Sequence, residues 1–292
     1  MDQPIKTPVD IISGFLGSGK TTLLNKMLGT VYKGIRIAIV ENEFGEVNID
    51  SQLLPQDVSI KEMSNGCACC TLRVELIDGL IKLNKLNRFD RIVIEPTGVA
   101  KLSDMLSLFE TDRLNKAVKK GVMIAVVNPL FHTRYSEILG DFYLNQIKHA
   151  DLIYMTRTKK TPKDILIDVT ADIKLSNDVM IVNQLPNNLL TIDFKNNILN
   201  NNHDNHHQHH HHDDAPDMFL TYTRRFDDVF SEETITDLID NILTSAKGDV
   251  LRIKGTLTCS DTFCFVQWVP GELNIKKTTH SDNLLVVIET RN

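Results

Sequence analysis

Three of the five cysteines in the chain, Cys67, Cys69 and Cys70, stand within four positions of one another. They follow an Asn-Gly dipeptide at residues 65–66, which favours a tight turn. Cysteines this close cannot easily bond to each other without strain, whereas their thiolates can converge on a soft divalent ion, most commonly Zn²⁺. Three sulfur ligands leave a fourth position for a carboxylate, a histidine, water or a ligand from a partner. The group therefore predicts a metal site, with buried and inert cysteines as the alternative.

A catalytic thiol is a second alternative for this group. Arg73 is close enough in sequence to lower the pKa of a neighbouring thiol, but no histidine occurs in the local sequence. The two distal cysteines, Cys259 and Cys264, fall in predicted strands, and we expect them to be structural.

A glycine-rich stretch, GFLGSGKTT at residues 14–22, matches the phosphate-binding pattern G-x-x-x-x-G-K-[ST]. It lies between a predicted strand and a predicted helix, which is the context the motif requires. Glycines allow backbone N–H groups to surround an anion, and the helix N-terminus adds its dipole. Lys20 would reach the β- and γ-phosphates and Thr21 would bind Mg²⁺. Rather than a plain turn, we expect a nucleoside triphosphate site formed by Gly14, Gly17, Ser18, Gly19, Lys20, Thr21 and Thr22.

The run DRIVIEPTG at residues 90–98 is predicted to form another strand, and its apolar part ends at Glu95. We therefore expect a carboxylate at the end of this strand. Beside a phosphate loop, this residue would contact Mg²⁺ or orient the attacking water. Gly98 could offer its N–H to the γ-phosphate. The alternative is a strand-end turn in which the proline and glycine only interrupt the structure.

Three glutamates, Glu41, Glu43 and Glu46, stand in the first six residues of the stretch ENEFGEVNID at residues 41–50. A loop here could sense the γ-phosphate as a nucleotide switch. Glu41 and Glu46 could also complete the shell of the metal at the cysteines, and Glu43 is a second candidate for orienting the water. A solvated acidic loop is an equal alternative.

Seven of the ten histidines lie in HDNHHQHHHHDD at residues 203–214. Imidazoles on a flexible chain bind Zn²⁺, Ni²⁺ or Co²⁺ without fixed geometry, and could raise the local ion concentration near a tighter site. A low-complexity linker without chemistry is the alternative. The predicted auxiliary metal ligands are His203, His206, His207, His209, His210, His211 and His212.

Apolar runs alternate with amphipathic stretches through the first 190 residues. Strands are predicted at 9–15, 35–42, 90–98, 122–128, 150–156 and 178–185, and helices at 20–29 and 74–86. This alternation predicts an α/β fold with a mostly parallel, three-layer sheet. After an Asn- and His-rich linker at 191–216, a small α+β domain is expected at 217–292. Its predicted elements are a helix at 231–243 capped by Ser231 and strands at 218–226, 249–259, 264–271 and 284–290.

The whole-chain composition is that of an ordinary globular protein, with 42% hydrophobic residues among 292. A formal net charge of −6 gives no support to nucleic-acid binding. No apolar run reaches about 18 residues, so we expect no membrane span. The N-terminus has no signal-peptide pattern, and we expect a cytoplasmic protein with reduced thiols.

The order of four motifs along the chain resembles that of the CobW-type P-loop GTPases, the metallochaperones related to the nickel and corrinoid insertion GTPases. These motifs are GFLGSGKTT, ENEFGEV, NGCACCTLR and DRIVIEPTG. The resemblance covers most of the first domain and extends to the small C-terminal domain. It implies that Cys67, Cys69 and Cys70 bind the transition-metal ion. It also implies that Thr21 and Glu95 bind Mg²⁺ and that residues 41–46 form the first nucleotide switch.

In the same family a guanine-reading Asn-Lys-x-Asp motif usually follows the strand at 150–156. Here Thr156 stands in the place of the Asn and Lys159 in the place of the Asp. An ammonium cannot accept the N–H groups of guanine as a carboxylate does. We expect Thr156 and Arg157 to contact the nucleotide. The family implies that this nucleotide is GTP, and another purine nucleotide is the alternative. Asn128 also replaces a common Asp.

The resemblance implies GTP binding and slow hydrolysis that gate delivery of a metal ion, with zinc the leading expectation and cobalt the alternative. The expected partner is a client metalloprotein or a protein of the cobalamin or corrinoid pathway. A homodimer is also compatible with the sequence. A second hypothesis is a nucleotide-regulated activator that carries no ion itself. A third, a P-loop kinase, would require an acceptor pocket that the sequence does not display.

Overall fold

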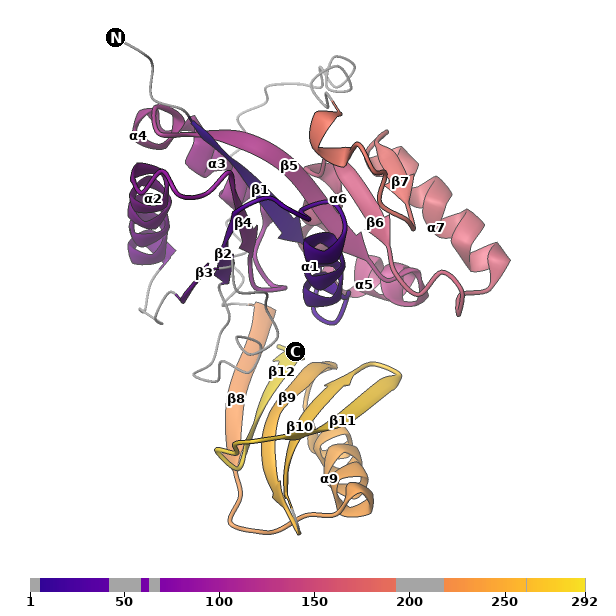
Figure 1. The fold of residues 1–292 in the computed structure, drawn as a ribbon. Helices are drawn as coiled ribbons and strands as arrows, with labels where there is room; N and C mark the ends of the chain where they lie inside the picture. The colour runs from indigo at the N-terminus through magenta and orange to yellow at the C-terminus, as the bar shows by residue number, and fades with distance from the viewer. Residues whose placement is uncertain (1–5, 42–58, 63–68, 193–217, 261, 292) are drawn as a thin grey trace. The chain divides into compact units, whose positions relative to one another are not determined.

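The computed structural model describes residues 6–41, 59–62, 69–192, 218–260 and 262–291, and all structural statements below concern those residues. The chain divides into two compact units, Met1–Asp204 and Asn205–Asn292, which are described separately (Figure 1).

The first unit is built on a seven-stranded sheet with the order β3-β2-β4-β1-β5-β6-β7, and its neighbouring strands are paired in parallel. The strands are β1 Thr7–Ser13, β2 Ile37–Glu41, β3 Ser59–Glu62, β4 Arg91–Glu95, β5 Val118–Val127, β6 Leu152–Met155 and β7 Met180–Val182. The helices are α1 Lys20–Gly29, α2 Cys69–Lys85, α3 Leu102–Ser107, α4 Asp112–Asn115, α5 His132–Leu139, α6 Asp141–Lys148 and α7 Lys163–Ser176, with short 3₁₀ turns at η2 Leu108–Glu110, η3 Pro129–Phe131 and η4 Leu189–Thr191.

Both faces of this sheet are covered. On one face, alternate residues of the central strands pack with α1 and η4, among them Ile12, Ile39, Ile124 and Leu24. The residues between them, such as Ile11, are equally buried, as strands buried on both faces must be. The predicted three-layer α/β fold is therefore confirmed.

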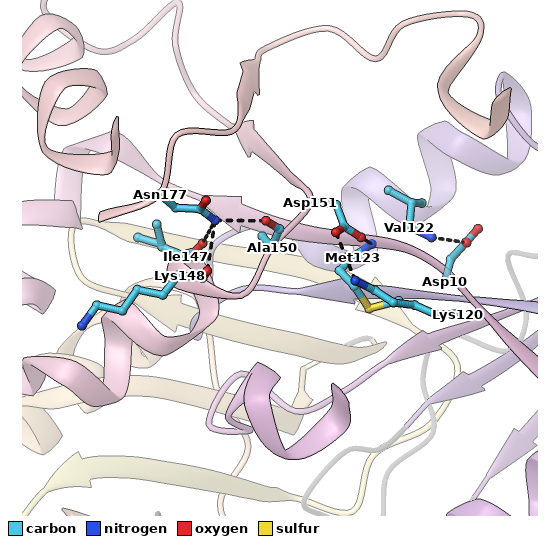
Figure 2. Close-up of polar contacts among 9 residues, drawn as sticks. All are labelled: Asp10, Lys120, Val122, Met123, Ile147, Lys148, Ala150, Asp151 and Asn177. Atoms are coloured by element: carbon cyan, nitrogen blue, oxygen red, sulfur yellow. Dashed lines mark hydrogen bonds and ion pairs between the residues drawn. The ribbon is translucent and has the colours of Figure 1, made fainter. Parts of the chain in front are cut away.

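A buried carboxylate fills an irregularity between β1 and β5, where the register shifts between Val9 and Ile11. Asp10 is fully buried and accepts hydrogen bonds from the Val122 N–H at 2.8 Å and the Tyr32 hydroxyl at 2.7 Å. The Arg91 guanidinium pairs with the same carboxylate. Figure 2 shows the Asp10–Val122 contact. Each polar group of this cluster thus has a partner, as burial requires.

Asp151 and Asn177 make the other polar contacts drawn in Figure 2, the first with β5 and the second with the end of α6. Asp151 accepts from the Met123 N–H at 2.9 Å and from Lys120 Nζ at 3.1 Å. The Asn177 amide donates to three carbonyls around the end of α6, those of Ile147, Lys148 and Ala150. These contacts satisfy carbonyls that the end of α6 leaves unpaired and the N–H of Met123 within β5.

The described residues of the second unit form a five-stranded antiparallel sheet with the order β11-β10-β9-β12-β8, on which helix α9 packs. Its elements are β8 Phe219–Arg225, α9 Glu232–Ser245, β9 Val250–Cys259, β10 Thr262–Val269, β11 Glu272–Thr278 and β12 Leu284–Thr290. The apolar face of α9, with Ile235, Ile239 and Ile242, packs on the sheet. Ser231 caps this helix as predicted, in a reciprocal capping box with Thr234.

Several expectations need correction or extension. Helix α2 begins at Cys69, five residues before the predicted start, so Cys69 and Cys70 belong to its first turn. Strands β3 and β11 were not predicted, because β3 has only four residues and β11 carries a charged face. Cys259 and Cys264 are joined by a disulfide between β9 and β10, in contrast to the expected reduced thiols. In the described part of the chain, no helix is long and apolar enough to cross a membrane.

Replacing Asp10 by Ala should lower the free energy of unfolding by about 3–5 kcal/mol, because the change leaves Arg91 and the Val122 N–H without their buried acceptor. Urea unfolding followed by circular dichroism measures this. The control is Asp90→Ala, which breaks an exposed pair with Arg36 and should have little effect. Equal effects of the two changes would contradict the importance of burial.

Candidate nucleotide-binding site

The phosphate loop joins β1 to α1 in a backbone conformation that favours glycine. Gly14, Gly17 and Gly19 have φ values of 145°, 69° and 105°. A Cβ at Gly14 would stand 2.5 Å from the Val126 carbonyl oxygen and 2.7 Å from Ser18 Oγ. The loop therefore lies directly against β5, and its tight curve depends on glycine.

Lys20 begins α1 and is buried under the loop. Its Nζ donates to the Gly14 carbonyl at 2.9 Å, and its side chain is 8% exposed. Ser18 Oγ, also buried, has no hydrogen-bond partner among the described residues. An ammonium, an unpaired hydroxyl and a helix N-terminus at one place are the donors that an anionic phosphate group requires.

Thr21 and Glu95 meet beside this loop. The Thr21 hydroxyl donates to Glu95 Oε1 at 2.8 Å, and Glu95 ends β4 with 8% of its surface exposed. A hydroxyl and a carboxylate are hard oxygen ligands, so the pair fits Mg²⁺. Thr21 and Glu95 would hold this ion, which would supply positive charge to neutralise the charge that develops on the phosphates.

The segment after β4 is packed onto the phosphate loop. A Cβ at Gly98 would come within 2.7 Å of the Leu16 backbone nitrogen. Gln146 of α6, 2% exposed, donates its amide to the carbonyls of Gly98 and Ala100 at 3.1 and 3.0 Å. Gly98 is thus held next to the loop, where its N–H was predicted to meet a γ-phosphate.

Thr156 and Arg157 contact the phosphate loop from the end of β6. The Thr156 hydroxyl donates to the Ser18 carbonyl at 2.8 Å. Arg157 adopts a left-handed conformation, with φ of 53°, and donates to the Gly17 carbonyl at 3.2 Å. Lys159 is exposed. Asn128, at the end of β5, accepts from the Leu130 N–H and caps η3.

An aromatic cluster supports the loop from behind, and no sequence motif pointed to it. The ring of Phe15 lies 4.7 Å from that of Tyr135 and 5.9 Å from that of Tyr143. The Tyr143 hydroxyl contacts His132 Nδ1 at 3.1 Å, and His132 Nε2 contacts Asp172 of α7. Burial raises the pKa of Tyr135 to about 12 and that of Tyr143 further still.

The predicted metal site lies largely outside the described residues. This applies to Cys67, Glu43, Glu46 and the histidines of 203–212. The structure describes only the backbone of Glu41, at the end of β2, and of Cys69 and Cys70, at the start of α2. Within the described part of the chain, no group of three His, Cys, Asp or Glu side chains could hold a metal ion. The cysteine site remains a prediction.

Comparison with known proteins supplies the family. The model of the CobW/HypB/UreG nucleotide-binding domain matches residues 8–182, more than half of the chain. The chain belongs to this family. Its predicted resemblance to the CobW-type proteins is confirmed.

Two relatives illustrate the similarity. The zinc-regulated GTPase metalloprotein activator 1 of Dictyostelium discoideum is 34% identical over 200 residues, covering 60% of this chain and 39% of the relative. The zinc chaperone YjiA of Escherichia coli is 39% identical over 160 residues, covering 51% and 49%. The chain therefore matches less than half of the length of either relative.

A solved structure covers nearly the whole chain. The Zn(II)-bound YjiA GTPase from Escherichia coli aligns with a TM-score of 0.51 and 23% identity over 98% of this chain and 95% of that one. At this identity the likeness establishes the fold, a P-loop domain followed by a smaller one.

Replacing Gly98 by Ala should weaken nucleotide binding at least about tenfold, because the new methyl group must displace the Leu16 backbone and with it the phosphate loop. Titration with a fluorescent nucleotide measures the change. Gly29→Ala is the matched control, since a Cβ there meets nothing within 4 Å. Unchanged affinity in the Gly98 variant would show that this contact does not hold the loop.

The buried tyrosines predict a loss of stability at alkaline pH. Tyr32, Tyr135 and Tyr143 all have raised pKa values, chiefly because of burial, whereas an unfolded tyrosine ionises near pH 10. Their stabilising effect is complete below that pH and is lost as pH rises towards 12. Absorbance at 295 nm should show part of the tyrosines ionising late, together with unfolding; ionisation of all of them near pH 10 in the folded chain would contradict this.

Proposed function

We propose that the chain is a GTP-hydrolysing metallochaperone that carries Zn²⁺ to a client protein. The contact of Thr21 with Glu95 beside the phosphate loop is the observation that carries the proposal. It brings a hydroxyl, a carboxylate and the buried Lys20 ammonium to one place, which is the donor and ligand set for Mg²⁺ and a triphosphate.

The topology supports a link between nucleotide and metal. Because the strands of the sheet are parallel, the segments that follow β1, β3 and β4 leave the sheet at the same carboxyl edge. The residues that follow these strands in sequence include the phosphate loop, the cysteine group that continues into the first turn of α2, and Gly98. We therefore assign the cargo site to Cys67, Cys69 and Cys70, with Glu41 and Glu46 as candidates to complete it.

The proposed reaction is attack of water on the γ-phosphate of GTP, which gives GDP and phosphate. Lys20 would exchange the Gly14 carbonyl for phosphate oxygens, and Gly98 would donate its N–H to the γ-phosphate. Glu95, or Glu43, would orient the water. With no glutamine assigned to that task, turnover should be slow.

Zinc is the favoured cargo because the relatives' names describe a zinc-regulated activator and a zinc chaperone; cobalt is the alternative. The histidines of 203–212 would gather the ion near the tighter site. A different candidate is an activator that carries no ion. One relative's name, a metalloprotein activator, favours it.

Zinc affinity of the full chain, measured by competition with a chromophoric chelator, tests the proposal. We compare wild type with Cys67→Ser/Cys69→Ser/Cys70→Ser, each with Mg²⁺ and either GDP or a non-hydrolysable GTP analogue. Losing three thiolates should weaken Zn²⁺ binding at least about 100-fold, since losing a residue that only hydrogen-bonds to a metal ligand already weakens binding about 10–100-fold. Cys259→Ser/Cys264→Ser is the control and should keep the wild-type affinity.

Equal affinity of the triple variant and the wild type would exclude cargo binding at the cysteines and favour the activator. Phosphate release should fall about 100-fold in Lys20→Ala, as expected when a donor to the transition state is removed. Repeating the nucleotide titration with ATP settles the base choice. If Zn²⁺ leaves nucleotide affinity unchanged, reciprocity means that nucleotide does not control the metal either.

A further inference from the structure

A short helix, α3, lies between the loop that follows β4 and the start of α2. It begins at Leu102, four residues after Gly98, and spans roughly 9 Å at 1.5 Å per residue. Asn145 of α6 holds its first turn, accepting from the Ser103 N–H at 3.1 Å and donating to Ser103 Oγ at 3.0 Å. Together with the Gln146 contacts, this places one end of α3 beside the phosphate loop.

The other end of α3 is held by an arginine of α2. Arg73 donates from one terminal nitrogen to Ser107 Oγ at 2.8 Å and from the other to the Ser107 carbonyl at 3.0 Å. Ser107 Oγ in turn donates to the Asp104 carbonyl at 2.8 Å. The guanidinium therefore binds the C-terminal end of α3 with two parallel hydrogen bonds, and its positive charge suits the negative end of a helix.

Arg73 stands four residues after Cys69 and three after Cys70, about one helical turn away in the same helix. From the sequence, Arg73 was considered as a residue that lowers the pKa of a neighbouring thiol. Its guanidinium instead binds α3, so its contact is with the segment that begins at Gly98. One α-helical turn then separates this contact from the backbone of the two cysteines.

We propose that Arg73 is a positioning residue that couples the cysteine turn to the nucleotide-sensing loop after β4, through α3. This inference rests on the proposed function. A shift of Gly98 on binding or loss of a γ-phosphate moves α3, and Arg73 transmits that shift to the first turn of α2. Rigid elements joined by specific contacts are the physical basis of such coupling.

A second contact between the same parts of the fold provides a control. Asp78, further along α2, forms an ion pair with Arg113 of α4. This pair also ties α2 to the region after α3, but it lies nine residues beyond Cys69. Removing it loosens α2 without touching the first turn, so it separates coupling from a general effect on helix packing.

The experiment measures the ratio of Zn²⁺ affinities of the full chain with Mg²⁺ plus a non-hydrolysable GTP analogue and with Mg²⁺ plus GDP. Typical couplings change affinity about 5–150-fold. We expect Arg73→Ala to lower the ratio at least about fivefold, and Arg73→Lys to have an intermediate effect, because an ammonium cannot form the two parallel bonds. Arg113→Ala, and the exposed Arg88→Ala with the same loss of charge, should keep the wild-type ratio.

Ser107→Ala removes one of the two acceptors and should act through the same contact. In a double-mutant cycle, the effects of Arg73→Ala and Ser107→Ala on the ratio should therefore be less than additive. Thermal unfolding of each variant shows whether the chain remains folded. If Arg73→Ala does not fold, the ratio of Zn²⁺ affinities is compared between the wild type and Arg73→Lys, which keeps the charge.

The outcomes are distinguishable. A wild-type ratio above about five that Arg73→Ala leaves unchanged overturns this inference and leaves the proposed function standing. The same holds if Arg113→Ala lowers the ratio as much as Arg73→Ala. A wild-type chain that binds no Zn²⁺, or whose affinity ignores the nucleotide, overturns the proposed function and this inference with it.

Discussion

The carbonyl groups of the phosphate loop must be held from behind if its N–H groups are to face an anion. Two side chains that are distant in sequence, at the end of β6, perform this task. Arg157 binds the Gly17 carbonyl and Thr156 binds the Ser18 carbonyl. Each of these hydrogen bonds partly neutralises the negative charge of a carbonyl oxygen, so less negative charge opposes a bound phosphate. The loop is therefore prepared for an anion electrostatically as well as sterically.

This requirement explains much of the surrounding structure. Thr156 and Arg157 can reach the loop only because β6 is paired beside β5, and Asp151 fixes the start of β6 through the Met123 N–H. Phe15 anchors the start of the loop by packing on Tyr135 and Tyr143. The buried Asp10 closes the irregularity between β1 and β5, on which the end of β1 and the start of the loop depend.

The sequence predicted those parts of the molecule that follow from local periodicity. Helix α1 was predicted with its observed bounds, Lys20–Gly29, because the glycines before it and its apolar spacing leave few alternatives. Strand β3 was missed because a four-residue strand gives too few positions for a period to show. The start of α2 was placed too late because cysteine is a weak helix former. The aromatic cluster and the Arg73–Ser107 contact join residues distant in sequence, which no local pattern reveals.

The stretch at residues 156–161 separates two tasks that a family motif combines. Supporting the phosphate loop requires donors to its carbonyls, and Thr156 and Arg157 supply them although neither matches an asparagine-lysine pair in full. Reading guanine requires an acceptor for its N–H groups, and the exposed Lys159 cannot provide one. A hydroxyl and a guanidinium thus provide the support without an acceptor at the base-reading position. Phosphate binding and base recognition therefore place separate physical requirements on this stretch.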